Sequence, residues 1–220
     1  KKTLPPIHFM HNSSNRYHPL RMMLVALLCL GALAEYARAG DASSIKGFTA
    51  AMMKLSPTIN PAEAQLVSVT SHETARRMAR EWRVVPPSNF HNFLIHIGAR
   101  ERGFCFDWAH AIGAQLKTLP LKTLELHWAE AYPNSRLEHN VVVVTAIGQP
   151  IEKGYIIDGW RAAGRLLWWP VVKDEYPWKE NLAETAWIQN RGPDPLRLQD
   201  KPLLQETAGK QSGRKAAGSL

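Results

Sequence analysis

Three residues that lie far apart in the sequence have the side chains of a thiol-based acyl-transfer site, namely Cys105, His139 and Asp158. In such a site a thiolate attacks a carbonyl carbon, an imidazole accepts and returns the proton, and a carboxylate holds the imidazole in one tautomer. A metal site would need more ligands at short spacing, and these three residues contain no closely spaced pair. We therefore expect nucleophilic catalysis here, with no metal and no cofactor.

Each of the three residues also has an ordinary structural interpretation. A single cysteine is often a small buried hydrophobe, a histidine at a strand end is often a satisfied polar residue, and an aspartate before glycine often forms a turn. The chain order of thiol, imidazole and carboxylate, together with the elements expected to carry them, favours the catalytic interpretation.

The segment 105–117 is expected to form a helix with Cys105 in its first turn. The free backbone N–H groups and the dipole at a helix start favour an anion, and hence a thiolate. The same N–H groups are suited to stabilise an oxyanion after the thiol has attacked a carbonyl. Asp107 is expected on the far side of this helix, where it orients the helix start or a backbone turn.

Beyond Pro120 the sequence becomes rich in β-branched and aromatic residues separated by turn signals, which predicts strands at 123–131, 138–146, 154–160 and 165–172. Short links favour an antiparallel meander. His139 opens the second strand and Asp158 ends the third. Pairing through the connection at 148–150 brings together residues whose numbers sum to about 297, which places His139 opposite Asp158.

Helices are expected before these strands. Asn60 is a predicted N-cap for a helix from 61 to about 85, and Ser88 for a second one ending near 98. In this second helix His91 and His96 diverge by about 140°, so they are a poor metal pair. Helices followed by strands predict the α+β class.

Three short motifs contain the candidate triad: Gly103-Phe104-Cys105-Phe106-Asp107-Trp108-Ala109, Glu138-His139-Asn140-Val141 and Ile157-Asp158-Gly159-Trp160. Over roughly residues 60–173 the chain resembles the transglutaminase-like branch of the papain-like cysteine enzymes. This resemblance implies a papain-like/transglutaminase-like core, with N-terminal helices packed on an antiparallel β-sheet. It also implies a Cys-His-Asp triad that hydrolyses amide or peptide bonds or transfers their acyl groups.

Members of that superfamily also include inactive relatives. The alternative is therefore a catalytically inactive papain-like domain that binds an envelope partner or serves as a scaffold through a Trp-rich or Arg-rich surface.

Papain itself has a glutamine several residues before its cysteine as an oxyanion donor, and the segment 99–104 contains none. The backbone N–H of Cys105 is the first expected donor, and the candidates for the second are His127, Trp128 and Asn89. We also assign Trp160 and Trp128 to substrate binding. Trp160, with Trp168 and Trp169, is suited to line an apolar or glycan-binding groove, or else belongs to the core and rim of the sheet.

The charge of +8 on 220 residues is concentrated at the two ends of the chain. Residues 1–39 contain five Lys or Arg and one acidic residue, and residues 201–220 contain four and one. The remaining body has 18 basic and 17 acidic residues, which argues against nucleic acid as a partner. We expect a disordered basic tail at 201–220 and a single transglutaminase-like domain at 40–200, in which 174–200 either completes the domain or covers the cleft.

Residues 22–34 form an apolar run that is short for a membrane span. Arg16 and Arg21 precede this run, and Ala37-Arg38-Ala39 follows it, which is typical of a secretory signal cleaved before Gly40. Residues 1–39 are thus predicted to be a signal peptide with an N-terminal extension, although an uncleaved anchor stays open. We expect an exported, periplasmic or secreted protein without a stable membrane span after cleavage, whose substrates are peptide or protein amides of the cell envelope.

Overall fold

The computed structural model describes residues 18–192 and 194. The expected disordered tail at 201–220 lies outside the described residues. The chain divides into two units, residues 1–43 and 44–220, and helix α1 (His18–Met52) includes the boundary. Apart from α1, every element belongs to the second unit.

Residues 1–17 of the expected signal segment lie outside the described residues, and residues 18–39 fall within α1. Of their side chains, those of Met22 to Leu27 are described as exposed. Among the described residues, no helix combines the length and the apolar character required to cross a membrane. Export and cleavage before Gly40 stay predictions.

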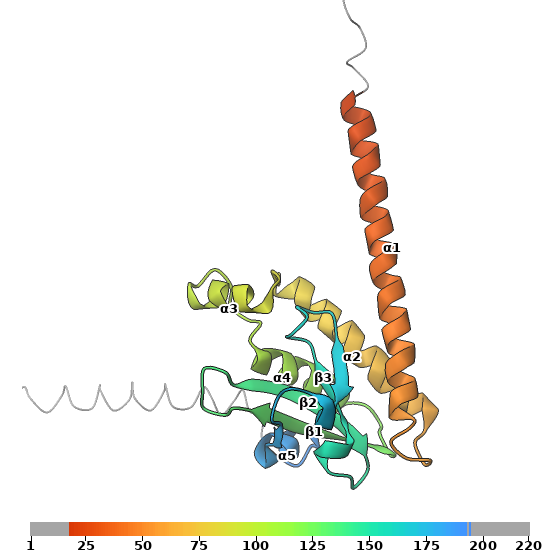
Figure 1. Ribbon diagram of the computed structural model, residues 1–220, viewed down its shortest axis with the longest axis vertical. Coiled ribbons are helices and arrows are strands. Elements are labelled where there is room, and N and C mark those ends of the chain that lie inside the picture. The colour runs from red at the N-terminus through yellow and green to blue at the C-terminus, as the bar shows by residue number, and fades with distance from the viewer. Residues whose placement is uncertain (1–17, 193, 195–220) are drawn as a thin grey trace, which may run out of the picture. The chain divides into compact units, whose positions relative to one another are not determined.

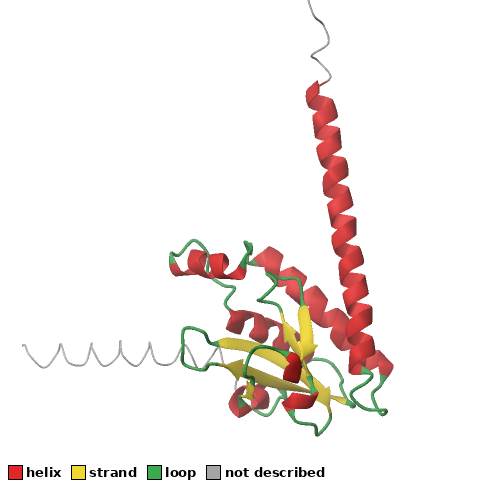
Figure 2. Ribbon diagram, viewed as in Figure 1, coloured by secondary structure: helices red, strands yellow, loops and turns green. Residues whose placement is uncertain are grey.

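The second unit has helices first and strands afterwards, so the α+β class is confirmed (Figures 1 and 2). Its helices before the sheet are α2 (Pro61–Glu81), α3 (Ser88–His96) and α4 (Cys105–Leu116). Its strands are β1 (Leu124–Ala131), β2 (His139–Ala146), β3 (Tyr155–Asp158), β4 (Leu167–Pro170) and β5 (Lys179–Glu180), followed by α5 (Leu182–Ile188).

The strands form one antiparallel sheet in the order β4-β3-β2-β1-β5, so the meander expected for the first four strands is present. The expected register between β2 and β3 was wrong by two residues. Val142 pairs with Ile157, and paired residue numbers therefore sum to 299. The connection includes a 3₁₀ turn at Ile151–Lys153, which shifts its centre toward the C-terminus. A shift of two residues preserves the faces of the strands, because side chains alternate with period two.

The end of α1 and helices α2, α4 and α5 pack on one face of the sheet. Trp128, Val142 and Ile157 point from three strands into a core shared with α2, α4 and the end of α1. The opposite face is covered by shorter segments, with Val141, Val143 and Ile156 in a second, smaller core. Because of this alternation, the first residue of β2, His139, faces the smaller core, whereas the next residue, Asn140, faces α4.

Most predicted element ends lie within two residues of the observed ones, but α2 ends at Glu81 rather than near residue 85, and one predicted cap was wrong. Asn60 caps α2 by accepting a hydrogen bond from the backbone N–H of Ala62 at 2.9 Å. Ser88 was expected to cap α3, but the N-cap position is Pro87. The Ser88 hydroxyl instead donates to the carbonyl oxygen of Trp160.

Residues 174–192, which the sequence left open, complete the sheet. Strand β5 adds to β1, and α5 packs beside them with Trp187 and Ile188 in the larger core. Residues just before β5 contact the site, as described below.

Gly159 marks where the end of β3 meets α4. A Cβ atom at this position would lie 2.5 Å from Cε3 of Trp108, which is buried. We expect Gly159→Ala to lower the free energy of unfolding by about 1–3 kcal/mol, because the rigid indole has no room to move. Urea unfolding followed by tryptophan fluorescence measures this change, and an unchanged midpoint would contradict the close contact between β3 and α4.

Candidate active site

Cys105 is the first residue of α4, as the sequence predicted, and its side chain is half-buried. Its sulfur donates to the carbonyl oxygen of Glu138 at 3.6 Å. Asp107 holds the turn before it, because Oδ2 accepts from the backbone N–H groups of Gly103 and Phe104 at 2.9 and 3.0 Å. Asp107 therefore orients the helix start and leaves the backbone N–H of Cys105 available for a ligand.

His91 also fixes the backbone that precedes Cys105. Its Nε2 donates to the carbonyl oxygen of Arg102 at 2.9 Å, and its Nδ1 accepts from the backbone N–H of Val85 at 3.2 Å. Gly103 has φ of 128°, and a Cβ atom there would lie 2.5 Å from the His91 ring. Both the positive φ and the close contact with the His91 ring require glycine at this position. Both ring nitrogens of His91 are thus engaged in hydrogen bonds that hold the backbone before Cys105.

His139 and Asp158 form a buried pair. Nε2 of His139 lies 2.8 Å from Oδ2 of Asp158, and both residues are 2% exposed. The carboxylate therefore holds the proton of this imidazole on Nε2. Nδ1 of His139 is buried without a hydrogen-bond partner among the described residues, and it is the ring nitrogen that Asp158 does not engage.

The charge of His139 follows from these neighbours. Burial lowers its pKa, but the hydrogen bond to Asp158 and the interaction with the Cys105 sulfur outweigh burial and raise the pKa of His139 to about 9. An imidazolium flanked by a carboxylate and by the Cys105 sulfur is the charge distribution that a thiolate nucleophile requires.

Asp158 is held by more than the histidine. Its Oδ2 also accepts from Nε of Arg161 at 2.7 Å, and its Oδ1 accepts from the backbone N–H groups of Trp160 and Arg161. Burial raises the pKa of Asp158, but His139 and Arg161 hold it below its ordinary value. Arg161 in turn forms a bidentate pair with Asp174 at 2.9 and 2.6 Å. Asp158 is therefore ionised and fixed in place.

Aromatic rings surround the imidazole. The ring centroids of Trp160, Tyr176 and Trp178 lie 4.9, 5.1 and 5.4 Å from that of His139. Trp178 donates from its indole N–H to Asp174 at 3.1 Å, so the segment before β5 is tied to the same network as Asp158. These rings shield the histidine and carboxylate from water.

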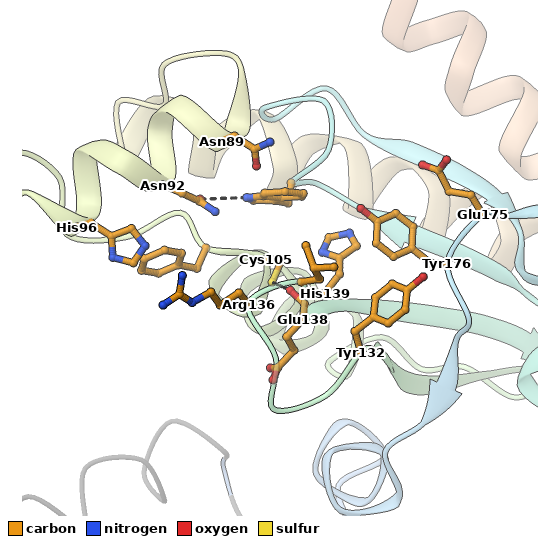
Figure 3. A pocket seen from close by; sticks show the side chains of 13 residues that line it. Asn89, Asn92, His96, Cys105, Tyr132, Arg136, Glu138, His139, Glu175 and Tyr176 are labelled. Carbon is orange, nitrogen blue, oxygen red and sulfur yellow. Dashed lines mark hydrogen bonds between the residues drawn. The ribbon is translucent and has the colours of Figure 1, made fainter.

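Helix α3 forms one wall of the site and is attached through Trp160. The indole N–H of Trp160 donates to Oδ1 of Asn92 at 3.2 Å, and the Trp160 carbonyl accepts from Ser88. Because Oδ1 of Asn92 is engaged, its amide NH₂ is directed toward the pocket (Figure 3).

A cavity of about 920 Å³ opens above Cys105 and His139 (Figure 3). Its size is in the range typical of ligand-binding pockets. The lining combines aromatic rings with amides and charged groups: Asn89, Asn92, His96, Phe104, Cys105, Tyr132, Arg136, Leu137, Glu138, His139, Trp160, Glu175 and Tyr176.

The structure separates the tryptophans that the sequence grouped together. Trp160 lines the cavity. Trp128, which we assigned to substrate binding, is fully buried, and its indole N–H donates to Oδ1 of Asn140 at 2.9 Å. Trp168 stacks on Phe48 and Trp169 lies at the exposed sheet edge, so neither lines the cavity.

The three candidates for a second oxyanion donor also differ in position. Asn89 lines the cavity, whereas Trp128 does not. His127 lies within the sheet, where it is engaged by Glu180 at 2.7 Å and Thr145 at 2.9 Å.

Sequence reasoning missed two residues that contact the triad. Arg161 follows Asp158 by three residues, and this acid–base spacing was its only signal. Asn140 stands inside the quoted histidine motif but received no role, and its Nδ2 lies 4.0 Å from the Cys105 sulfur.

Among residues 18–192 and 194 there is no group of three His, Cys, Asp or Glu side chains arranged to hold a metal ion. Comparison of the chain with protein-family models, with curated proteins and with solved structures gives no match. The geometry of the site is therefore the observation on which a function can be based.

The raised pKa of His139 makes stability depend on pH. The folded-state value of about 9 lies above the unfolded value of 6.5, so protonation stabilises the fold fully below pH 6.5. This stabilisation is lost as the pH rises through about 9. We expect the free energy of unfolding to fall over this range, by up to about 3 kcal/mol, and His139→Gln to lack this fall. Urea titrations at several pH values measure it, and equal losses in both proteins would show that His139 does not have the raised pKa.

Proposed function

We propose that this protein is an exported thiol hydrolase or acyl transferase of the transglutaminase-like, papain-like kind, acting on amide or peptide bonds. Cys105 is the nucleophile, His139 the general base and acid, and Asp158 the residue that orients His139. By its expected location, the accessible substrates are peptides or proteins of the cell envelope.

One observation carries the proposal: His139, joined to the buried Asp158 at 2.8 Å, lines the same cavity as a cysteine at a helix start. The three residues come from α4, β2 and the end of β3, and this order agrees with the resemblance. Burial of a charged pair costs desolvation free energy, and such pairs are frequent at functional sites. A purely structural pair would not require a sulfur beside it.

The chemistry follows from these positions. In the proposed ion pair the proton of the thiol already lies on Nδ1 of His139. The thiolate forms a bond to the carbonyl carbon while the C=O π electrons move to oxygen. The oxyanion then returns its electrons, the C–N bond breaks, and the imidazolium gives its proton to the leaving amine. Water or a second amine, deprotonated by His139, attacks the thioester and releases Cys105. Both outcomes share this acyl-enzyme.

Alkylation of Cys105 with iodoacetamide tests the nucleophile without a known substrate. We expect Cys105 to react already near neutral pH, because the His139 imidazolium persists to about pH 9 beside the sulfur. Peptide mapping separates Cys105 from Cys29, the other cysteine of the chain. His139→Gln is expected to move the reaction to higher pH. A wild-type Cys105 that reacts only above about pH 8, as an ordinary cysteine does, would contradict the proposal and leave the inactive binding domain as the better interpretation.

Cys105→Ser tests catalysis itself. We expect this variant to keep the unfolding midpoint of the wild type and to lose at least about 100-fold in amide turnover, because a hydroxyl is a far weaker nucleophile beside this base. Hydrolysis of a fluorescently labelled casein and amine incorporation into it are measured in parallel. Turnover at the wild-type rate would show that another residue is the nucleophile.

A further inference from the structure

The oxyanion site of this protein has one donor from α4 but lacks the glutamine that papain places before its cysteine. A tetrahedral intermediate is best stabilised by two donors that converge on the position of its oxygen. A second, preoriented N–H group therefore has to come from a side chain next to Cys105.

We infer that Asn140 is the second oxyanion donor and that Trp128 orients its amide. This inference rests on the proposed function, because it assigns a role within the same reaction. Asn140 is 5% exposed, and its Nδ2 lies 4.0 Å from the sulfur of Cys105. It is thus a buried amide next to the nucleophile.

The orientation of this amide is determined by its neighbours. The indole N–H of Trp128 donates to Oδ1 of Asn140 at 2.9 Å, which fixes the oxygen on the side away from the cysteine. The NH₂ group therefore faces Glu138 and Cys105. One of its hydrogens is donated to Oε1 of Glu138 at 3.0 Å, and the other can point toward the sulfur of Cys105.

The distance to the sulfur suits an oxyanion better than a thiol. At 4.0 Å, Nδ2 is too far away for a strong hydrogen bond to Cys105 itself. The oxygen of a carbonyl that the sulfur has attacked is held two bonds from Sγ, so it can come within hydrogen-bond distance of an N–H group that lies 4.0 Å from the sulfur. The donor is then engaged in the transition state more fully than in the free enzyme, which is the condition for catalysis.

Trp128 lies where a buried side chain can orient Asn140. It lies in β1 with its side chain on the α4 face, and its neighbour across the sheet is Val142, two residues beyond Asn140. Trp128 is fully buried and far better placed to orient Asn140 than to contact a substrate. It is therefore a positioning residue and Asn140 a catalytic one.

The test compares two reactions of the same sulfur. Acylation by p-nitrophenyl acetate passes through a tetrahedral oxyanion, whereas alkylation by iodoacetamide displaces iodide and forms none. In Asn140→Ala we expect Cys105 acetylation to fall by about 100- to 1,000-fold at saturating ester, with alkylation within about threefold of the wild type. Mass spectrometry of the Cys105 peptide follows both reactions.

Two further variants separate catalysis from folding. Trp128→Phe keeps Asn140 but releases its oxygen, and we expect a loss of about tenfold in acetylation alone. Thr185→Val is the matched control, because Thr185 accepts a hydrogen bond from the backbone N–H of Trp128 at 2.9 Å and is buried outside the cavity. It removes a comparable buried contact and is expected to acetylate at the wild-type rate. Asn140→Asp, which keeps the side-chain volume and has no donor when ionised, replaces Asn140→Ala if the alanine variant does not fold.

Each result decides the inference. A parallel loss of acetylation and alkylation in the Asn140 variants, or acetylation that is unchanged in them, would overturn the role of Asn140 while wild-type acetylation still supports the proposed function. A wild-type protein that is alkylated at Cys105 but never acetylated would overturn both, and it would do so without any variant.

Discussion

The architecture of the site depends on one buried carboxylate. Asp158 accepts hydrogen bonds from His139, from the Arg161 side chain and from two backbone N–H groups. Because it is nearly inaccessible to solvent, the charge of Asp158 has to be compensated by these hydrogen bonds rather than by water. These bonds also connect Asp158 to different parts of the chain. His139 lies at the start of β2, and Trp160 is bonded to Asn92 of α3. Arg161 is paired with Asp174, in the segment before β5.

This arrangement explains why the aromatic cover is built from distant segments. Tyr176 and Trp178 approach His139 because Asp174, between Arg161 and Trp178, fixes the course of their segment. Trp160 approaches it because its backbone N–H is bound by Asp158 and its indole by Asn92. The cover keeps the local dielectric low, which strengthens the interaction of imidazolium with both carboxylate and sulfur. The same groups that stabilise the fold thereby set the charge state on which a thiol nucleophile depends.

The sequence predicted the order of helices and strands, the helix that begins at Cys105 and the His139–Asp158 contact, because each depends on local periodicity or on strand faces. It missed the exact register, since a 3₁₀ turn at 151–153 leaves no strong signal, but a register error of two residues does not change faces. It also misplaced Trp128, because a tryptophan in a strand has the same pattern whether it lines a pocket or a core. The roles of Arg161 and Asn140 depend on three-dimensional neighbours, Asp174 and Trp128, that lie 13 and 12 residues away.

The alternating side-chain directions in β2 place His139 and Asn140 on different sides of the strand. Consecutive residues of a strand point to opposite faces, so His139 and Asn140 extend from the two sides of β2 at its first two positions. In the middle of the sheet, such a pair would be divided by the backbone and could not act on one atom. At the start of the strand the sheet ends, and the sulfur of Cys105 lies within reach of Asn140 and of the Glu138 carbonyl just before it. A single dipeptide can then offer a base on one side of a nucleophile and a hydrogen-bond donor on the other, and the sheet that positions the one positions the other as well.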